Sequence, residues 1–363
     1  MKNKLLIVFS AVMIIIATAC TNRQQQQEQQ REQEQEQEQE QEQYIEKEKE
    51  KVELWRIRKG TKWGFIDEQG KIVIKPQFED AGYYSEGLTD VKKGGKWGYI
   101  DKQGKMVIKP QFDYAFSFSE GLAMVDVGGK RGYIDIQGKM VINPQFDFAD
   151  YFSDGLAVVR IGDFINGLYG YIDKQGKYLI NPQFKISANS FHENLAAVWI
   201  GGNSGKMGVI DKQGNCVISP QFENILYFSE GLAAVEKREK GELFSKWGYI
   251  NKKGKFVIKP QFRNAGSFSE GLADVEINGK YGYINRQGTI IINPQFESTF
   301  NFSEGLACVK IAGKYGYIDK QGKFIINPQF DRAYSFKGNF AEIEIDGKFG
   351  LIDKQGNIIY KEP

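Results

Sequence analysis

A phrase of about 34 residues recurs nine times along the chain and constrains its fold more than any other feature. A clear copy between residues 96 and 123 reads Lys-Trp-Gly-Tyr-Ile-Asp-Lys-Gln-Gly-Lys, then Pro-Gln-Phe, then Phe-Ser-Glu-Gly-Leu-Ala. The glycine after the tryptophan position recurs at intervals of 34 to 40 residues, at Gly64, Gly98, Gly132, Gly170, Gly208, Gly248, Gly282, Gly316 and Gly350. A fixed period of this size indicates a stacked repeat architecture, in which each unit packs mainly against its neighbours.

Each unit contains three short apolar segments that predict β-strands, for example residues 121–127, 131–135 and 139–142. Gly128-Gly129 and Gly138 fit tight turns between them, because glycine accepts positive φ angles. Pro144 predicts the end of the third strand, since proline cannot donate to a β-ladder. The second and third strands carry apolar residues on both faces, so we expect neighbouring units to cover them at a spacing of about 10 Å.

The sequence therefore predicts an all-β tandem array of nine three-stranded antiparallel units. The segment 52–58 fits a first strand and 357–360 fits a third strand, so neither end leaves a split unit that would close a ring by strand exchange. Propellers typically have 4–8 blades. These two points favour a curved, propeller-like stack or an open superhelical solenoid, with a closed β-propeller as the alternative.

The N-terminal residues predict export from the cytoplasm. Lys2 and Lys4 precede an apolar run from Leu5 to Ala19, which is the layout of a secretory signal and is shorter than the roughly 20 residues of a spanning helix. The ending Ala17-Thr18-Ala19-Cys20 resembles the lipobox of bacterial lipoproteins, although Ala17 departs from the bulky aliphatic residue usual there. The resemblance implies cleavage before Cys20 and a lipid on its sulfur, with an uncleaved signal anchor as the alternative.

A Gln/Glu-rich segment separates this leader from the repeats. Residues 22–51 contain ten Glu and five Lys/Arg, and no apolar residue before Tyr44, which predicts a solvated tether. We therefore expect a signal peptide at 1–19, a lipidated cysteine and tether at 20–51, and a repeat domain at 52–363. The formal charge of the whole chain is only +2, without a basic patch, which argues against nucleic-acid binding.

The recurring phrase resembles the WG-repeat family, also called KWG repeats. The resemblance rests on the Lys-Trp-Gly-Tyr-Ile-Asp-Lys-Gln-Gly-Lys, Pro-Gln-Phe and Phe-Ser-Glu-Gly-Leu-Ala phrases and covers about residues 54–360. It implies a bacterial repeat module, in a family with many secreted members and no shared catalytic residues. The tryptophan itself is replaced in six of nine copies, by Arg131, Tyr169, Met207, Tyr281, Tyr315 and Phe349, so the position calls for a large side chain.

We find no set of residues that predicts catalysis, a cofactor or a metal site. The single histidine, His192, stands where other units have serine, and no nucleophile accompanies it. The repeated aspartates after the second strand, such as Asp101, alternate with Asn251 and Asn285, which indicates turn capping. No spacing of histidine and cysteine fits zinc, and Cys216 and Cys308 lie in different units, which argues against a disulfide.

Three consecutive units carry longer loops between their first and second strands, at residues 161–169, 200–206 and 237–246. Insertions on one side of a repeat array often form a binding face. We therefore predict a candidate binding patch, with neutral loop drift as the alternative. Its residues are Phe164, Leu168, Tyr169, Arg238, Lys240, Leu243 and Phe244.

Together these features predict a lipid-anchored, extracytoplasmic repeat protein of the bacterial envelope, acting as a binding module without catalysis. We expect its partner to be an envelope or extracellular protein. A glycan or peptidoglycan ligand is one alternative, and a structural scaffold in envelope assembly is another. An enzyme is the class least supported by the residues.

Overall fold

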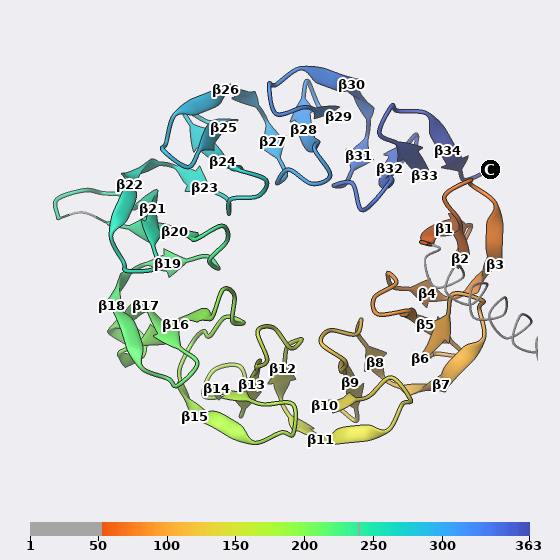
Figure 1. Cartoon of the computed structure of the whole chain (residues 1–363), viewed down its shortest axis with the longest axis horizontal. Helices are drawn as coiled ribbons and strands as arrows, with labels where there is room; N and C mark the ends of the chain where they lie inside the picture. The colour runs from red at the N-terminus through yellow and green to blue at the C-terminus, as the bar shows by residue number, and fades with distance from the viewer. Residues whose placement is uncertain (1–52, 239) are drawn as a thin grey trace, which may run out of the picture. The chain divides into compact units, whose positions relative to one another are not determined.

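The computed structural model describes residues 53–238 and 240–363, which form nine small antiparallel sheets. The sheets stand side by side in a closed ring, like the blades of a propeller (Figure 1). The only helix among the described residues is the single 3₁₀ turn η1 (Gly202–Ser204), and none of their helices is long and apolar enough to cross a membrane. The predicted signal peptide, Cys20 and the tether lie outside the described residues.

Every blade contains a first, a second and a third strand in chain order. The first strands are β1 (Trp55–Lys59), β5 (Leu88–Lys93), β9 (Ala123–Val127), β13 (Ala157–Ile161), β16 (Leu195–Ile200), β20 (Leu232–Lys237), β24 (Leu272–Ile277), β28 (Ala307–Ile311) and β32 (Phe340–Ile345). The second strands are β2 (Lys62–Ile66), β6 (Lys96–Asp101), β10 (Lys130–Ile134), β14 (Leu168–Ile172), β17 (Lys206–Asp211), β21 (Lys246–Asn251), β25 (Lys280–Asn285), β29 (Lys314–Ile318) and β33 (Lys348–Asp353). The third strands are β3 (Ile72–Phe78), β7 (Met106–Phe112), β11 (Met140–Phe146), β15 (Tyr178–Phe184), β18 (Cys216–Phe222), β22 (Phe256–Phe262), β26 (Ile290–Phe296), β30 (Phe324–Phe330) and β34 (Ile358–Lys361).

Seven blades also have a two-residue inner strand, which the sequence reading missed. These are β4 (Asp80–Ala81), β8 (Tyr114–Ala115), β12 (Phe148–Ala149), β19 (Asn224–Ile225), β23 (Asn264–Ala265), β27 (Ser298–Thr299) and β31 (Arg332–Ala333). We number the blades 1 to 9 in chain order, so that blade 1 is β1–β3, blade 2 is β4–β7 and blade 9 is β31–β34. The inner strands lie toward the centre of the ring and the third strands lie at its outer rim (Figure 1).

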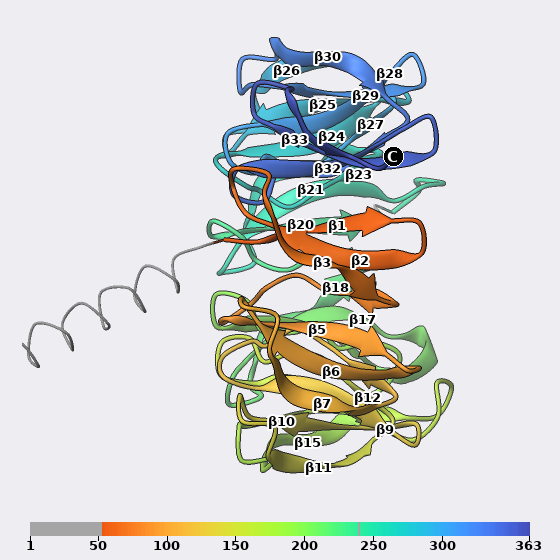
Figure 2. The ribbon, with the colours of Figure 1, turned by 90° about the vertical axis from the view of Figure 1, so that its right-hand side faces the viewer.

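The two faces of the ring carry different turns (Figure 2). One face, which we call the hairpin face, carries the turns between first and second strands. The other, which we call the staple face, carries the Ser-Glu-Gly turns and the Asp-x-Gln-Gly turns. They share this face because the start of each first strand pairs with the end of the second, as in Ala123 opposite Ile134.

The proline does not end the third strand, contrary to the expectation from sequence. In blade 3, Tyr133 pairs with Ile142 and Arg131 with Phe146, so two residues of β10 span four of β11. Pro144 lies within this bulge, where no ladder donor is required, and the strand continues beyond it.

The same bulge explains the glycine of the Trp-Gly position in the eight blades whose third strand contains the proline. A Cβ atom added to Gly98 would lie 2.7 Å from the nitrogen of Pro110 and 2.8 Å from the carbonyl carbon of Lys109. Its φ angle is not in the left-handed region, since it is absent from the positive-φ glycines of the described residues. Space, and not backbone conformation, therefore demands glycine there.

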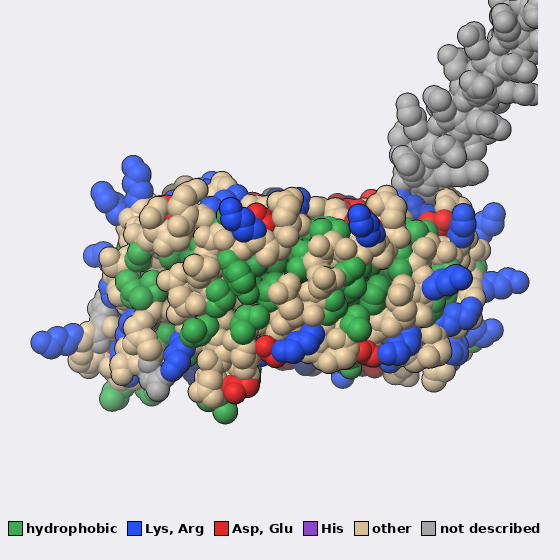
Figure 3. Space-filling view, turned by 90° about the horizontal axis from the view of Figure 1, so that it is seen from below, with side chains coloured by type: hydrophobic (Ala, Val, Ile, Leu, Met, Phe, Trp, Pro, Cys, Tyr) green, Lys and Arg blue, Asp and Glu red, His purple; other side chains and the backbone are tan. Residues whose placement is uncertain are grey.

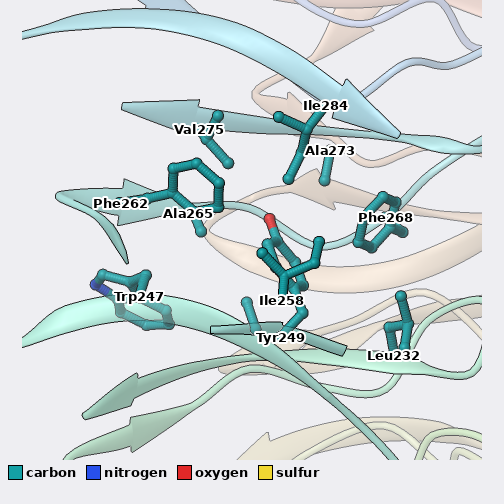
Figure 4. Packing of buried hydrophobic residues seen from close by; sticks show 11 residues of the cluster. Leu232, Trp247, Tyr249, Ile258, Phe262, Ala265, Phe268, Ala273, Val275 and Ile284 are labelled. Carbon is teal, nitrogen blue, oxygen red and sulfur yellow. The ribbon is translucent and has the colours of Figure 1, made fainter. Parts of the chain in front are cut away.

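Apolar side chains from facing sheets form one core cluster at each junction between blades. At the junction of blades 6 and 7, Tyr249 and Phe262 pack against Phe268, Val275 and Ile284 (Figure 4). The prediction that neighbouring units cover the second and third strands on both faces is confirmed for the second strand, where Tyr99 and Ile100 are fully buried. The third strand differs, because Val107 lies at the outer rim and is 40% exposed.

This outer position forms an apolar band around the ring, between rows of lysine and arginine (Figure 3). Its members are exposed aliphatic residues at one repeat position: Val73, Val107, Val141, Leu179, Val217, Val257, Ile291 and Ile325. The third strands are also free sheet edges. Proline in eight of them blocks edge-to-edge pairing with another chain.

The all-β array of nine units is confirmed, and the closed propeller, which we had treated as the alternative, is the arrangement that the structure adopts. The favoured open superhelix assumed that closure needs strand exchange. Instead, two whole blades meet face to face. The rings of Trp55 and Phe340 pack at a tilt of 56° with their centroids 4.5 Å apart, and Ile57 and Leu351 join the same buried cluster.

Polar contacts reinforce this seam. Arg56 Nε donates to Glu342 at 2.6 Å, its Nη2 donates to the second carboxylate oxygen at 3.0 Å, and both side chains are mostly buried. The hydroxyl of Tyr360 donates to the carbonyl of Arg58 at 2.6 Å, and Arg58 pairs with Glu362. Side-chain packing and ion pairs therefore replace strand exchange at the closure.

Candidate binding surfaces

The repeated glutamates of the Ser-Glu-Gly turns join neighbouring blades. The carboxylate of Glu120 in blade 3 accepts the N–H of Gly155 in blade 4 at 3.0 Å and pairs with Lys174 at 3.2 Å. Glu193 makes the same contacts with Gly231 and Lys252 one blade further on. These acids are engaged in inter-blade bonds, which agrees with the structural role expected from their repetition.

The serine of the same turn forms a second inter-blade bond. Ser119 Oγ donates to the carbonyl of Phe152 at 2.8 Å, and Ser153 Oγ donates to that of Phe191 at 2.6 Å. A tyrosine after the Trp-Gly position adds a third bond, as where Tyr133 donates to the carbonyl of Asp150 at 2.7 Å. Three polar bonds and an apolar core therefore fix one blade to the next.

The repeated Asp and Asn residues after the second strands, and the single histidine, have structural positions. Asp101 Oδ1 accepts the N–H groups of Gln103 and Lys105, and Asn251 does the same in blade 6, so the turn-capping prediction is confirmed. His192 occupies the serine position, and its ring lies 4.8 Å from that of Tyr227 in the next blade.

The remaining polar groups form no metal cluster in the part of the chain that the structure describes, where no three His, Cys, Asp or Glu residues converge. Cys216 is exposed and Cys308 is buried. Burial raises the pKa of the Cys308 thiol to about 12, which keeps the side chain neutral.

The inserted loop of blade 4 is a hydrogen-bonded turn that presents two apolar side chains to solvent. Asp163 Oδ1 accepts the N–H groups of Ile165 and Asn166 at 2.8 and 2.7 Å, and these bonds lower the pKa of the Asp163 carboxyl. Between these residues, Phe164 is 85% exposed and Ile165 is 82% exposed. A structured turn thus displays two apolar groups that bury little of their surface in the fold.

Arg160 lies between this loop and the inner strand β12, among three aromatic rings. The Arg160 guanidinium carbon lies 5.7 Å from the ring centroids of Phe164 and Tyr169 and 5.9 Å from that of Phe148. These distances lie within the range of cation–π attraction. Tyr169 and Leu168 are half-buried at the base of the loop, so of these three predicted patch residues only Phe164 is fully displayed.

The other two inserted loops, in blades 5 and 6, lie on the same hairpin face as the loop of blade 4. In blade 5, Trp199 Nε1 donates to the carbonyl of Gly202 at 2.6 Å, which folds the loop against the indole. In blade 6, Leu243 is 84% exposed and Phe244 is 78% exposed, while Lys246 pairs with Glu242 at 2.6 Å beside them. The predicted Arg238 and Lys240 are also exposed in this loop.

The structure therefore places all seven predicted patch residues in the loops of blades 4 and 6 or at their bases, two blades apart on one face. Sequence reasoning missed Ile165, which is as exposed as Phe164, and Arg160, which contacts the aromatic residues from below. The sequence carried a signal for both, since Ile165 follows Phe164 directly and Arg160 is the last residue but one of the strand before the loop.

Comparison with protein families decides the family of this chain. A model described as "WG containing repeat" matches residues 63–97, 97–130, 132–163, 169–203, 207–240, 247–281, 281–315 and 315–349. The chain belongs to the WG-repeat family. In the structure each WG repeat is offset from a blade by about half a repeat, because a match runs from the second strand of one blade through the first strand of the next.

Comparison with solved structures supports the fold of the WG repeats. A crystal structure of a eukaryotic initiation factor matches with a TM-score of 0.61 at 12% identity, covering 86% of this chain and 96% of that one. Hydrazine synthase of Kuenenia stuttgartiensis matches with a TM-score of 0.36 at 9% identity, covering 65% and 93%, and puromycin hydrolase with 0.38 at 12%, covering 70% and 56%. The first likeness shows the propeller fold alone. A search of curated proteins finds no match in sequence.

Proposed function

We propose that this WG-repeat propeller is an envelope binding module that captures another envelope or extracellular protein through the hairpin face of blades 4 to 6. A propeller built of WG repeats is an interaction module in its general class. The finer proposal names the face that binds and the kind of partner that it binds.

The exposure of Phe164, Ile165, Leu243 and Phe244 carries this proposal. Each of these side chains is at least 78% exposed and contributes almost no buried surface to the fold. Aromatic and aliphatic anchors of this kind, surrounded by basic groups such as Arg238 and Lys240, are typical of protein-binding sites. Fixed loop geometry also lowers the entropy that a partner must remove on binding.

The cellular placement rests on the leader sequence. We propose that the lipid on Cys20 anchors the chain and that the Gln/Glu-rich residues 22–51 hold the propeller outside the cytoplasm. Metabolic labelling with a fatty-acid analogue, compared between the native chain and Cys20→Ser, tests this directly. An equally labelled Cys20→Ser protein would contradict the anchor.

The binding face is tested in cells with a photo-crosslinking amino acid at position 164 and, separately, at position 244. One reproducible protein adduct from both positions supports the proposal, and the same probe at Val257 on the outer rim serves as the control. The double variant Phe164→Ser, Phe244→Ser should keep its unfolding midpoint and lose the adduct partner in co-purification. Undiminished co-purification would refute the patch.

A glycan ligand is the second candidate, favoured by exposed tyrosines on and after the inner strands. Tyr114, in β8, and Tyr151, Tyr227 and Tyr334, which follow inner strands, are each at least 42% exposed. Flat aromatic surfaces stack on sugar rings. Sedimentation with purified cell-wall sacculi, in the absence of any protein adduct, would move the proposal to this class.

A further inference from the structure

A cavity of about 520 Å³ lies between the loops that follow the inner strands β8 and β12, which we call the inner loops of blades 3 and 4. The exposed residues Phe164, Ile165, Leu243 and Phe244 of the hairpin face do not line it. Its lining includes Phe116, Met124, Arg131, Phe148 and Tyr151. Phe116 and Tyr151 are exposed and follow the inner strands β8 and β12, so the cavity opens toward the centre of the ring. Its size lies within the range of small-molecule sites.

The cavity lies where an arginine takes the place of the repeat tryptophan. At the matching position of blades 2 and 6, Trp97 and Trp247 are each 9% exposed and pack into the junction with the next blade. In blade 3 the narrower side chain of Arg131 occupies this position. Room for a ligand remains between the two inner loops.

Two aromatic rings hold the Arg131 guanidinium. Its central carbon lies 5.7 Å from the ring centroid of Phe116 and 4.9 Å from that of Phe148, within cation–π range. Nη1 donates to the carbonyl of Ala149 at 2.8 Å. Stacking and this bond fix the plane of the group before any ligand arrives.

The other donors of this guanidinium are available. Among residues 53–238 and 240–363, no acceptor bonds Nε or Nη2 of Arg131. The two nearby carboxylates are engaged, since Asp150 accepts from Ser190 Oγ at 2.8 Å and Asp126 accepts from the N–H of Gly129 at 3.0 Å. A fixed guanidinium edge with two adjacent donors matches the two oxygens of a carboxylate.

We propose that this Arg131 cavity binds an aromatic carboxylate, with the carboxylate on Nε and Nη2 of Arg131 and the ring among Phe116, Phe148 and Tyr151. The lining combines aromatic rings with one cation, Arg131, and one carboxylate, Asp150, which accepts bonds from Ser190 Oγ and from the N–H of Tyr151. The ligand that fits the rings and the free edge of Arg131 is flat and apolar except for one anionic end. The shared chemistry fits a free aryl acid or the C-terminal phenylalanine of a peptide. The proposal does not depend on a protein partner at the hairpin face.

The first experiment is a fluorine NMR titration of full-length protein in a non-ionic detergent with 4-fluorophenylacetate. We expect saturable binding, at least about 10-fold tighter than that of the neutral 4-fluorophenylacetamide, because a hydrogen-bonded charge is lost in the amide. Absence of saturable binding, or equal affinity for acid and amide, would overturn the proposal.

The repeat itself supplies the best variant. Arg131→Trp introduces the residue that blades 2 and 6 have at this position, and it should fill the cavity and abolish binding. The control variant Tyr315→Trp introduces tryptophan at the matching position of blade 8 and should leave binding intact. Arg131→Gln keeps the cavity and should weaken binding at least 10-fold even if the tryptophan variant folds poorly. Retained affinity in Arg131→Gln would refute the role of the guanidinium.

Two peptides then distinguish the sources of the ligand. Gly-Gly-Phe with a free carboxyl end should compete with 4-fluorophenylacetate if a chain terminus is the natural ligand, and its C-terminal amide should not compete. Competition by phenylacetate alone would assign a free aryl acid. Competition by the peptide acid and its amide to the same degree would contradict the carboxylate contact.

Discussion

The sharpest test of the fold compares alanine at two glycines of the same repeat position. At Gly98, an added Cβ would collide with the carbonyl oxygen of Ile108 and would lie 2.7 Å from Pro110 N and 2.8 Å from Lys109 C, against at least 3.4 Å for ordinary contacts. The backbone of β7 must therefore move. Gly350 in blade 9 faces a third strand without proline, and its pairing with Lys361 lies outside the one register shift of that strand, which falls between Leu351 and Ile352. There the nearest atoms are Tyr360 O at 3.0 Å and two side-chain carbons of Ile343 at 3.2 and 3.3 Å.

These distances set the expected magnitudes. Overpacking costs about 1–3 kcal/mol, and Gly98→Ala should reach the upper end because its obstacle is backbone on a strand that is held by a packed junction. Gly350→Ala should cost about 1 kcal/mol, since a flexible isoleucine and the last strand can yield. Both residues have φ angles open to alanine, so the entropic gain of alanine cancels between the two variants.

Urea unfolding followed by tyrosine and tryptophan fluorescence measures the difference. With an m-value of about 3 kcal/mol per molar, we expect Gly98→Ala to lower the midpoint by about 1 M and Gly350→Ala by a third of that. Equal losses at the two positions would refute the argument that the bulge demands glycine. A Gly98→Ala protein with the native midpoint would refute it more strongly.

Three further changes probe other parts of the ring. Burial raises the pKa of Asp90 from 3.8 to about 6, so the folded protein keeps its full stability below pH 3.8 and loses this contribution as the pH rises through 6. The free energy of unfolding of Asp90→Asn should therefore rise by up to about 3 kcal/mol relative to native protein between pH 4 and pH 7. Thermal melts across this pH range measure the difference, and a difference that is constant with pH would contradict the argument. At the seam, a double-mutant cycle of Arg56→Leu and Glu342→Leu should give a coupling energy of about 1–3 kcal/mol by urea unfolding, and a coupling near zero would show that the pair does not hold the ring closed. His192→Ser should add the missing serine bond to the next blade and raise stability by about 0.5–1 kcal/mol, whereas a loss would mean that the histidine ring on Tyr227 matters more.

The period and turn glycines were enough to predict nine β-units with their first and second strands. The inner strands escaped because two residues, such as Asp80–Ala81, leave no periodic pattern. Pro144 misled because a proline stops a regular ladder but fits a bulge, and the bulge depends on Gly132 in the neighbouring strand. Closure escaped because it depends on contacts such as Arg56 with Glu342, which lie 286 residues apart.

The candidate surfaces were predictable to different degrees. Phe164 and Phe244 stood out because they are apolar residues in nominally exposed loops. In the sequence, Arg131 is one of several large replacements for tryptophan. Its importance appears only in three dimensions, since Phe116 and Phe148 come from the inner loops of two different blades.

The bonds between blades join residues about one repeat apart, and this offset has an evolutionary consequence. Ser119 reaches Phe152 and Glu120 reaches Gly155, 33 and 35 residues on. Recombination that gains or loses a whole repeat therefore recreates compatible junctions on either side of the breakpoint. Among the described residues, the junction of blades 1 and 9 differs from this pattern, because Arg56 there pairs with Glu342 across 286 residues. The number of repeats in such a gene can therefore change one at a time, while the Arg56–Glu342 ion pair still joins the first blade to the last.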